Sequence, residues 1–213
     1  MTQPRPPTLA DIEVAVWQHL TRAPRDKHHE WRTPVLATAT RDGDGADART
    51  VVLREVDAVA RQLVIYTDSR AAKVAQLREQ PKATLVLWSA RLGWQLRCKL
   101  RCVIHEEGLA VASRWERLKL TRAAQDYLST AAPGSEAHGA QGAHGAQGAQ
   151  AAPGLDAAGG AGMSEATTSM GLSHRACFAV IEAQVLTLDW LELHPEGHRR
   201  ALFDETGSRW LVP

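Results

Sequence analysis

Five basic residues fall within 25 positions of this 213-residue chain: Arg49, Arg54, Arg61, Arg70 and Lys73. An arginine binds phosphate through two parallel hydrogen bonds, and a lysine contributes a mobile positive charge. The net charge of the chain is only +1, so this cluster is a local feature and not part of a basic surface. The sequence therefore predicts one anion site. The low net charge argues against a partner such as nucleic acid or an anionic membrane.

The run Arg49-Thr50-Val51-Val52-Leu53-Arg54 has the composition of a β-strand that begins and ends with arginine. On a strand, residues 49, 51 and 53 share one face, and residues 50, 52 and 54 share the other. Taken alone, the run is explained better by two strand-end arginines that reach solvent than by a binding site.

The residues that follow strengthen the binding interpretation. Tyr66-Thr67 ends the next predicted strand, and Asp68-Ser69-Arg70 leads directly into a predicted helix with Lys73 one turn further on. A helix N-terminus beside a hydroxyl and an arginine favours phosphate binding. Gln95 lies on a long predicted strand, where its amide can pair with the donor and acceptor edge of a heterocycle.

The pattern of apolar residues predicts the elements that carry these side chains. Helices are expected at 8–22, with Thr8 and Asp11 as a capping box, at 69–79, and as a pair within 106–129. Strands are expected at 35–40, 49–56, 62–67, 83–88, 92–104, 177–193, 199–203 and 208–212. Short turns between strands favour antiparallel pairing, and the chain has neither βαβ alternation nor a GxGxxG motif. We expect a mainly β fold, a closed antiparallel barrel with helices at its ends.

Composition also bears on the organisation of the chain. Residues 131–162 are almost wholly Ala, Gly, Gln, Pro and His, which predicts a flexible insert within a single domain at 1–213. Cys98, Cys102 and Cys177 have no metal-binding spacing, so we expect buried structural thiols, no metal site and a reducing compartment. The chain lacks a signal-like N-terminus and a membrane-length apolar run, which predicts a soluble, cytoplasmic protein.

These motifs, in this order, resemble the pyridoxamine 5′-phosphate oxidase superfamily of FMN-binding split β-barrels. The resemblance covers residues 33–104 and the C-terminal part from Trp190 through Arg200 to Pro213. It implies an antiparallel split β-barrel and a homodimer that holds FMN between its subunits. The positions that would contact FMN are Arg49, Thr50, Val51, Val52, Leu53, Arg54, Tyr66, Thr67, Ser69, Arg70, Lys73, Gln95, Trp190 and Arg200.

The resemblance also implies a role for each group of residues. Arg49 and Arg70 would hold the FMN phosphate, with hydroxyl contacts from Thr67 and Ser69. The backbone of 50–54 would run along the isoalloxazine ring. From the facing subunit, Gln95 would contact the flavin. Trp190 and Arg200 would close the same site.

The chain departs from the family pattern mainly on the substrate side. Ala71 stands where the family often has a lysine, for which Lys73 is a candidate substitute. Arg54 replaces a substrate-contacting lysine, and Glu196 stands in place of an arginine near the C-terminus. Residues 106–135 show no clear Tyr/Arg/Ser set for a substrate phosphate. The FMN part of the pattern is therefore present, whereas the part that binds pyridoxal phosphate is not, which argues against a pyridoxamine phosphate oxidase in the strict sense.

Three functions follow from this pattern. The first is an FMN-dependent oxidoreductase that acts on an unidentified small molecule, with catalytic residues unassigned. The second is a flavin-binding protein without turnover, for storage or sensing. The third keeps the barrel but binds a deazaflavin or a haem. The visible spectrum distinguishes the cofactors, and substrate-linked reoxidation of bound flavin distinguishes an enzyme from a storage protein.

Overall fold

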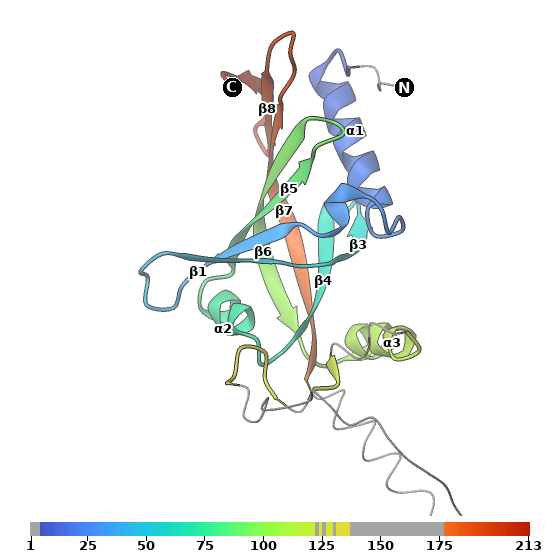
Figure 1. Ribbon diagram of the computed structural model, residues 1–213, viewed down its shortest axis with the longest axis vertical. Coiled ribbons are helices and arrows are strands. Elements are labelled where there is room, and N and C mark those ends of the chain that lie inside the picture. Colours follow the sequence, from blue (N-terminus) through green and yellow to red (C-terminus); the bar gives the residue numbers. More distant parts are fainter. Residues whose placement is uncertain (1–4, 122–123, 125–126, 130, 137–176) are drawn as a thin grey trace, which may run out of the picture.

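The computed structural model describes residues 5–121, 124, 127–129, 131–136 and 177–213 (Figure 1). The flexible insert predicted at 131–162 lies outside these residues from position 137 onward. The helices are α1 (Leu9–Arg22), α2 (Ala72–Glu79) and α3 (Leu109–Leu118), with a short 3-10 turn at Glu30–Arg32. The strands are β1 (Val35–Ala39), β2 (Ala46–Thr50), β3 (Leu53–Asp57), β4 (Gln62–Asp68), β5 (Lys82–Ser89), β6 (Trp94–His105), β7 (Phe178–Glu192), β8 (Arg199–Asp204) and β9 (Gly207–Leu211).

All strand pairs within the described residues are antiparallel, as the short turns predict, and they form one nine-stranded sheet. The order is β2-β1-β5-β6-β7-β4-β3, and β8 and β9 extend from β7. The long strands β6 and β7 pair along their whole length and form the centre of the fold (Figure 1). The first half of β7 pairs with β4 and its last residues pair with β8, so the sheet divides into two branches.

The strand predicted at 49–56 is in fact two strands. The chain leaves β2 after Thr50, and Val51 donates its N–H to the carbonyl of Pro34 at 2.9 Å before β3 begins at Leu53. β2 and β3 are the two ends of the strand path, and they do not pair with each other. The prediction of a closed barrel is therefore wrong, because this bend carries the chain from one edge of the sheet to the other without a ladder between them. The predicted split-barrel class, mainly β and antiparallel, is confirmed.

The N-terminal helix forms much as its sequence predicts. The Thr8 hydroxyl accepts from the Asp11 N–H at 3.2 Å, and the Asp11 carboxylate accepts from the Thr8 N–H at 3.3 Å, which completes the capping box. Ile12, Val16 and Leu20 are fully buried in the main core. The spacing of these three residues places them on one face of α1, so the helix covers the apolar side of the sheet.

The other helices differ more from the prediction. α2 begins at Ala72 and not at Ser69, because Asp68 organises a turn: its carboxylate accepts from the Arg70 N–H at 2.8 Å. α3 accounts for the first of the two helices predicted in 106–129 and buries Trp115 against Phe178 of β7. The second falls partly outside the described residues.

A pair of buried histidines joins α1 to the loop before β1. The Nδ1 atom of His19 lies 3.2 Å from the Nε2 atom of His29, and both rings pack against Trp31. Burial, followed by the nearby charge of His29, lowers the pKa of His19 to about 4. Burial also lowers the pKa of His29. Both histidines are therefore neutral in the folded chain at neutral pH.

Because the two histidines are buried in the neutral form, we expect the fold to lose stability in acid. The unfolded chain binds a proton at His19 near pH 6.5, whereas the folded chain resists it until about pH 4. The stabilisation is therefore complete above pH 6.5 and is lost as the pH falls toward 4. We expect the free energy of unfolding to drop by roughly 2 kcal/mol between pH 7 and pH 5, measured by urea titration. A His19→Gln variant should show a shallower dependence, and an equal slope in that variant would contradict the assignment.

Candidate functional site

Arg49 lies on β2 with its guanidinium held by three side chains. Its Nη1 donates to Thr38 Oγ1 at 2.6 Å, and its Nη2 donates to Gln76 Oε1 at 3.0 Å and to the carboxylate of Asp47. The side chain is 20% exposed, so the fork is fixed by neighbours and still reaches the surface. Gln76 and Asp47 were not predicted as site residues, because only the fold brings α2 against β2.

A second group of polar residues surrounds the start of α2. Lys73 Nζ donates to the hydroxyl of the buried Thr67 at 3.2 Å. Burial, followed by the positive charge of Arg49, lowers the pKa of Lys73, so the two cations lie close enough to repel. Arg70 donates to the Asp68 carboxylate from Nε at 3.0 Å and from Nη2 at 2.6 Å. The predicted phosphate ligands Arg49, Thr67, Arg70 and Lys73 therefore gather at one end of the sheet.

The backbone at this place also suits an anion. Ala71 is the N-cap of α2, and it provides no side-chain hydrogen bond to the first N–H groups of the helix. Such uncapped N–H groups carry the positive end of the helix dipole and attract phosphate. Ser69 precedes this cap, and its N–H donates to the carbonyl of Cys177 at 2.8 Å. The residues present thus fit the phosphate of a nucleotide such as FMN.

Arg54 and Tyr66 lie in a different environment, on the side of the sheet that α3 covers. The Arg54 guanidinium sits 5.6 Å from the centre of the Tyr66 ring, and the Tyr66 hydroxyl donates to Glu55 Oε1 at 2.6 Å. The pairing of β3 with β4 shifts register between Leu53 and Glu55. At this irregularity the neighbouring residues Arg54 and Glu55 both contact Tyr66. Burial, with the hydrogen bond to Glu55, raises the pKa of Tyr66, so its hydroxyl stays protonated.

Arg114 of α3 completes this charged group. Its Nε and Nη2 donate to Glu55 Oε2 at 3.1 and 3.0 Å, and its Nη1 donates to Glu182 at 3.2 Å. Arg114 and Arg117 are two cations that α3 brings to Glu55, the chain neighbour of Arg54, and Arg117 Nη2 lies 3.7 Å from Glu55 Oε1. Because two carboxylates already hold it, Arg114 is not free to bind a substrate phosphate. Sequence spacing gave no signal for this contact, since 59 positions separate Glu55 from Arg114.

Gln95 and Arg200 lie on the outer face of the sheet. The side chain of Gln95 alternates along β6 with the buried Trp94 and Leu96, and the exposed Trp88 stands directly opposite it on β5. Arg200 donates to Asp189 from Nε at 3.0 Å and from Nη2 at 2.9 Å. Trp88 was not predicted as a site residue, although an indole beside a glutamine suits a planar ring.

Trp190 is placed differently from the other predicted residues. It is fully buried in the main core, where its ring packs edge-on against Trp94 with 5.3 Å between centroids. Its indole N–H is buried without a hydrogen-bond partner in the described part of the chain. Trp190 therefore offers no surface to a ligand in the single chain, and the structure supports a packing role for it.

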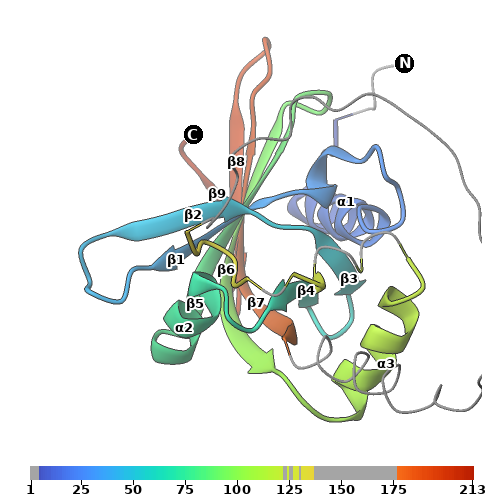
Figure 2. The same cartoon turned by 60° about the horizontal axis from the view of Figure 1, so that its bottom comes forward.

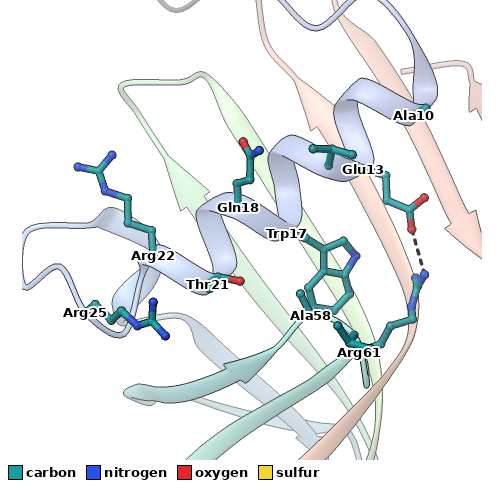
Figure 3. Close-up of a pocket in the computed structure, with 11 residues that line it drawn as sticks. Ala10, Glu13, Trp17, Gln18, Thr21, Arg22, Arg25, Ala58 and Arg61 are labelled. Carbon is teal, nitrogen blue, oxygen red and sulfur yellow. Dashed lines mark hydrogen bonds and ion pairs between the residues drawn. The ribbon is translucent and has the colours of Figure 1, made fainter.

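A separate hollow of about 900 Å³ lies between α1 and the turn that joins β3 to β4 (Figure 3). Trp17 forms one wall, with the Arg61 guanidinium 5.5 Å from its ring centre, and Arg61 donates to Glu13 at 2.9 Å. None of the residues predicted to contact FMN lines this hollow. It is thus a different surface from the phosphate cluster and from the outer face.

Residues 14–106 match the family model described as the pyridoxamine 5′-phosphate oxidase FMN-binding domain. Residues 14–106 thus have the sequence of a pyridoxamine 5′-phosphate oxidase-like domain. The matched residues include the phosphate cluster at β2 and α2 and extend to the end of β6. The described part of the chain contains no helix that is both long and apolar enough to cross a membrane.

A curated relative and two solved structures define how far this likeness extends. The pyridoxine/pyridoxamine 5′-phosphate oxidase of Thermosynechococcus vestitus is 42% identical over 78 residues, 37% of this chain and 36% of the relative. The chain thus matches little more than a third of that relative. An FMN-binding, pyridoxamine 5′-phosphate oxidase-related protein from Nostoc punctiforme superposes with a TM-score of 0.59 at 17% identity, covering 93% of this chain and 96% of that one.

PhzG from Burkholderia lata, solved with tetrahydrophenazine-1-carboxylic acid, gives a TM-score of 0.60 at 18% identity. The match covers 98% of this chain and 94% of PhzG. At such identities the two structures show the fold alone, and that fold is a split barrel.

Proposed function

We propose that this chain binds FMN and acts as an FMN-dependent oxidoreductase on a small molecule. The observation that carries the proposal is the gathering of Arg49, Arg70 and Lys73 at the uncapped start of α2, within a domain of an FMN-binding family. Arg49, Arg70 and Lys73 would bind the phosphate, and the Thr67 hydroxyl would add a hydrogen bond. Bound FMN would supply two-electron chemistry, and the protein would supply binding and orientation.

A homodimer is part of the proposal. The phosphate cluster lies between β2 and α2, whereas Gln95 and Arg200 lie on the outer face of the sheet. That outer face also exposes Val35 and Trp88, at 39% and 46%. A second copy that covers this face would bury these apolar side chains and would bring Gln95 and Arg200 to the flavin held by its partner.

The surroundings of Arg54 favour a substrate other than pyridoxamine phosphate. Arg114, the nearest cation from α3, is bound by Glu55 and Glu182. A phosphate placed here would meet these two carboxylates as well as three arginines, since Arg117 also pairs with Glu55 at 3.7 Å. Electrostatic repulsion from the carboxylates would offset much of the attraction.

The test is the absorption spectrum and the mass in solution of the purified protein after incubation with FMN and removal of the excess. The proposal requires the bands of oxidised flavin, about one FMN per chain, and the mass of a dimer. A featureless spectrum after this treatment would reject FMN as the cofactor. Flavin that is retained but never reduced by a broad set of small-molecule donors would favour a storage or sensing role.

Lys73 provides a sharper test of the phosphate site. We expect Lys73→Gln to weaken FMN binding about tenfold, because a partly buried ammonium beside Arg49 is lost. The measurement is the quenching of flavin fluorescence during a titration with protein. Lys82→Gln, an exposed position on β5, is the matched control and should bind as the unmodified chain does. An unchanged affinity for Lys73→Gln would show that this lysine does not replace the one missing at position 71.

A further inference from the structure

The outer face of the sheet holds a charged cleft of about 540 Å³. Its walls come from β5, β6, β7 and the β8–β9 hairpin, which are successive neighbours in the sheet (Figure 2). Four cations line it: Arg97, Lys99, Arg200 and Arg209. None of the roles that the sequence pattern implies includes Arg97, Lys99 or Arg209.

The carboxylates of Asp189 and Asp204 form ion pairs with the three arginines of the cleft. Asp189 accepts from Arg200 and also from Arg97, and Asp204 accepts from Arg209 at 2.7 Å. Although burial alone would raise it, the hydrogen bonds from Arg200 and Arg97 hold the pKa of Asp189 below its ordinary value. The hydrogen bond from Arg209 likewise lowers the pKa of Asp204. Both acids are therefore ionised at neutral pH, and the cleft keeps an excess of two positive charges.

Lys99 is the cation left over. It lies on the outward side of β6, two residues beyond Arg97, and within the described chain no carboxylate or hydrogen-bond acceptor pairs with it. The Lys99 ammonium lies in a cleft with excess positive charge, so a bound anion would stabilise it. The hydroxyls of Thr84 and Thr187 lie in the same cleft and can donate to that anion.

The rest of the lining is aliphatic. Leu202 of β8 and Leu211 of β9 face the cleft alongside the charged residues. A cleft of this size is within the range that holds small organic ligands, which usually bury an apolar body and place few polar groups. The combination therefore selects a molecule with an apolar body and an anionic end, and not a bare inorganic ion.

We propose that this cleft binds an organic acid, with its carboxylate at Lys99 and the hydroxyls of Thr84 and Thr187, and its apolar body against Leu202 and Leu211. Arg200, predicted to close the flavin site, also lines the cleft. The organic acid is then the substrate class of the flavin site, and this assignment of the ligand as substrate rests on the function proposed above. Binding of the acid itself does not depend on it.

The experiment is calorimetric titration of the FMN-treated protein with benzoate, and with benzamide as the neutral isostere. Benzoate should bind and benzamide should bind at least about tenfold more weakly. Lys99→Gln should weaken benzoate binding about tenfold, since it removes one charge-assisted contact. Lys82→Gln removes a lysine outside the cleft and should leave benzoate binding unchanged. Inorganic phosphate, added as competitor, should displace benzoate poorly.

Each other result overturns the proposal. Equal binding of benzoate to Lys99→Gln and the unmodified chain would do so, as would no binding to either. Displacement of benzoate by equimolar phosphate would mean a site for inorganic anions. A loss of dimer mass in Lys99→Gln with unchanged benzoate binding would assign the lysine to a subunit contact. The flavin absorbance of the same samples separates the two proposals: retained flavin without benzoate binding defeats only this one, and Lys99-dependent benzoate binding without flavin defeats only the flavin function.

Discussion

An Arg49→Ala variant should lose FMN. The guanidinium of Arg49 is fixed by Thr38, Asp47 and Gln76, so its fork is already oriented before a phosphate arrives. Removing two parallel charge-assisted hydrogen bonds to a phosphate should weaken FMN binding roughly 100-fold, a cost of about 2.7 kcal/mol. The measurement is a titration of FMN by flavin fluorescence, with the fraction of flavin retained after gel filtration as a second readout.

Two further variants make this result interpretable. Arg49→Lys keeps the charge without the planar fork and should show an intermediate loss, about tenfold. Arg41→Ala removes an exposed arginine that pairs with Glu79 and should bind FMN normally. Asp47 is 44% exposed, so losing that ion pair should cost little stability, but the buried Thr38 and Gln76 also lose a hydrogen-bond donor. The thermal unfolding of Arg49→Ala is therefore measured beside that of Arg49→Lys, which keeps a donor at this place. Full flavin occupancy in Arg49→Ala would reject the phosphate assignment.

The local elements were predictable because each depends on neighbouring residues. Thr8 and Asp11 define the start of α1, and the alternation along β6 separates the buried Cys98 from the exposed Lys99. The phosphate cluster was predictable in part, since Thr67, Arg70 and Lys73 follow one another at a strand-to-helix junction. These residues lie together in the fold because a short turn keeps the strand and the helix adjacent, so their order along the chain is preserved in space.

Contacts between distant segments could not be predicted in this way. Nothing in the sequence links Asp47 to Gln76, or Glu55 to Arg114, because these pairs depend on how the sheet branches and where α2 and α3 pack. The break between β2 and β3 was missed for a related reason. The β-branched residues at 51 and 52 favour an extended strand, whereas the chain bends where the Val51 N–H donates to the carbonyl of the distant Pro34. Trp190 matched a motif, but its burial depends on Trp94 across the β6–β7 pair.

The second large effect concerns Trp190. A Trp190→Ala variant should lower the free energy of unfolding by about 3–5 kcal/mol, because it opens a cavity in a fully buried part of the core. Trp190→Phe should cost much less, since phenylalanine keeps most of the ring contact with Trp94 and removes an indole N–H that is buried without a partner. Urea unfolding measures both, at one fixed FMN concentration because bound ligand adds to apparent stability.

The phenylalanine variant distinguishes packing from flavin contact. If Trp190 acts by packing, Trp190→Phe should bind FMN within about twofold of the unmodified chain, because the Arg49 phosphate contact is intact. Trp210→Ala is the matched control: Trp210 is 47% exposed, with the Arg199 guanidinium 5.9 Å from its ring centre, so its loss should cost no more than about 1 kcal/mol. A stable Trp190→Phe protein that nevertheless releases FMN would show that the indole touches the flavin. Pairing with a second subunit would then have to expose the Trp190 ring, because this ring is fully buried in the single chain.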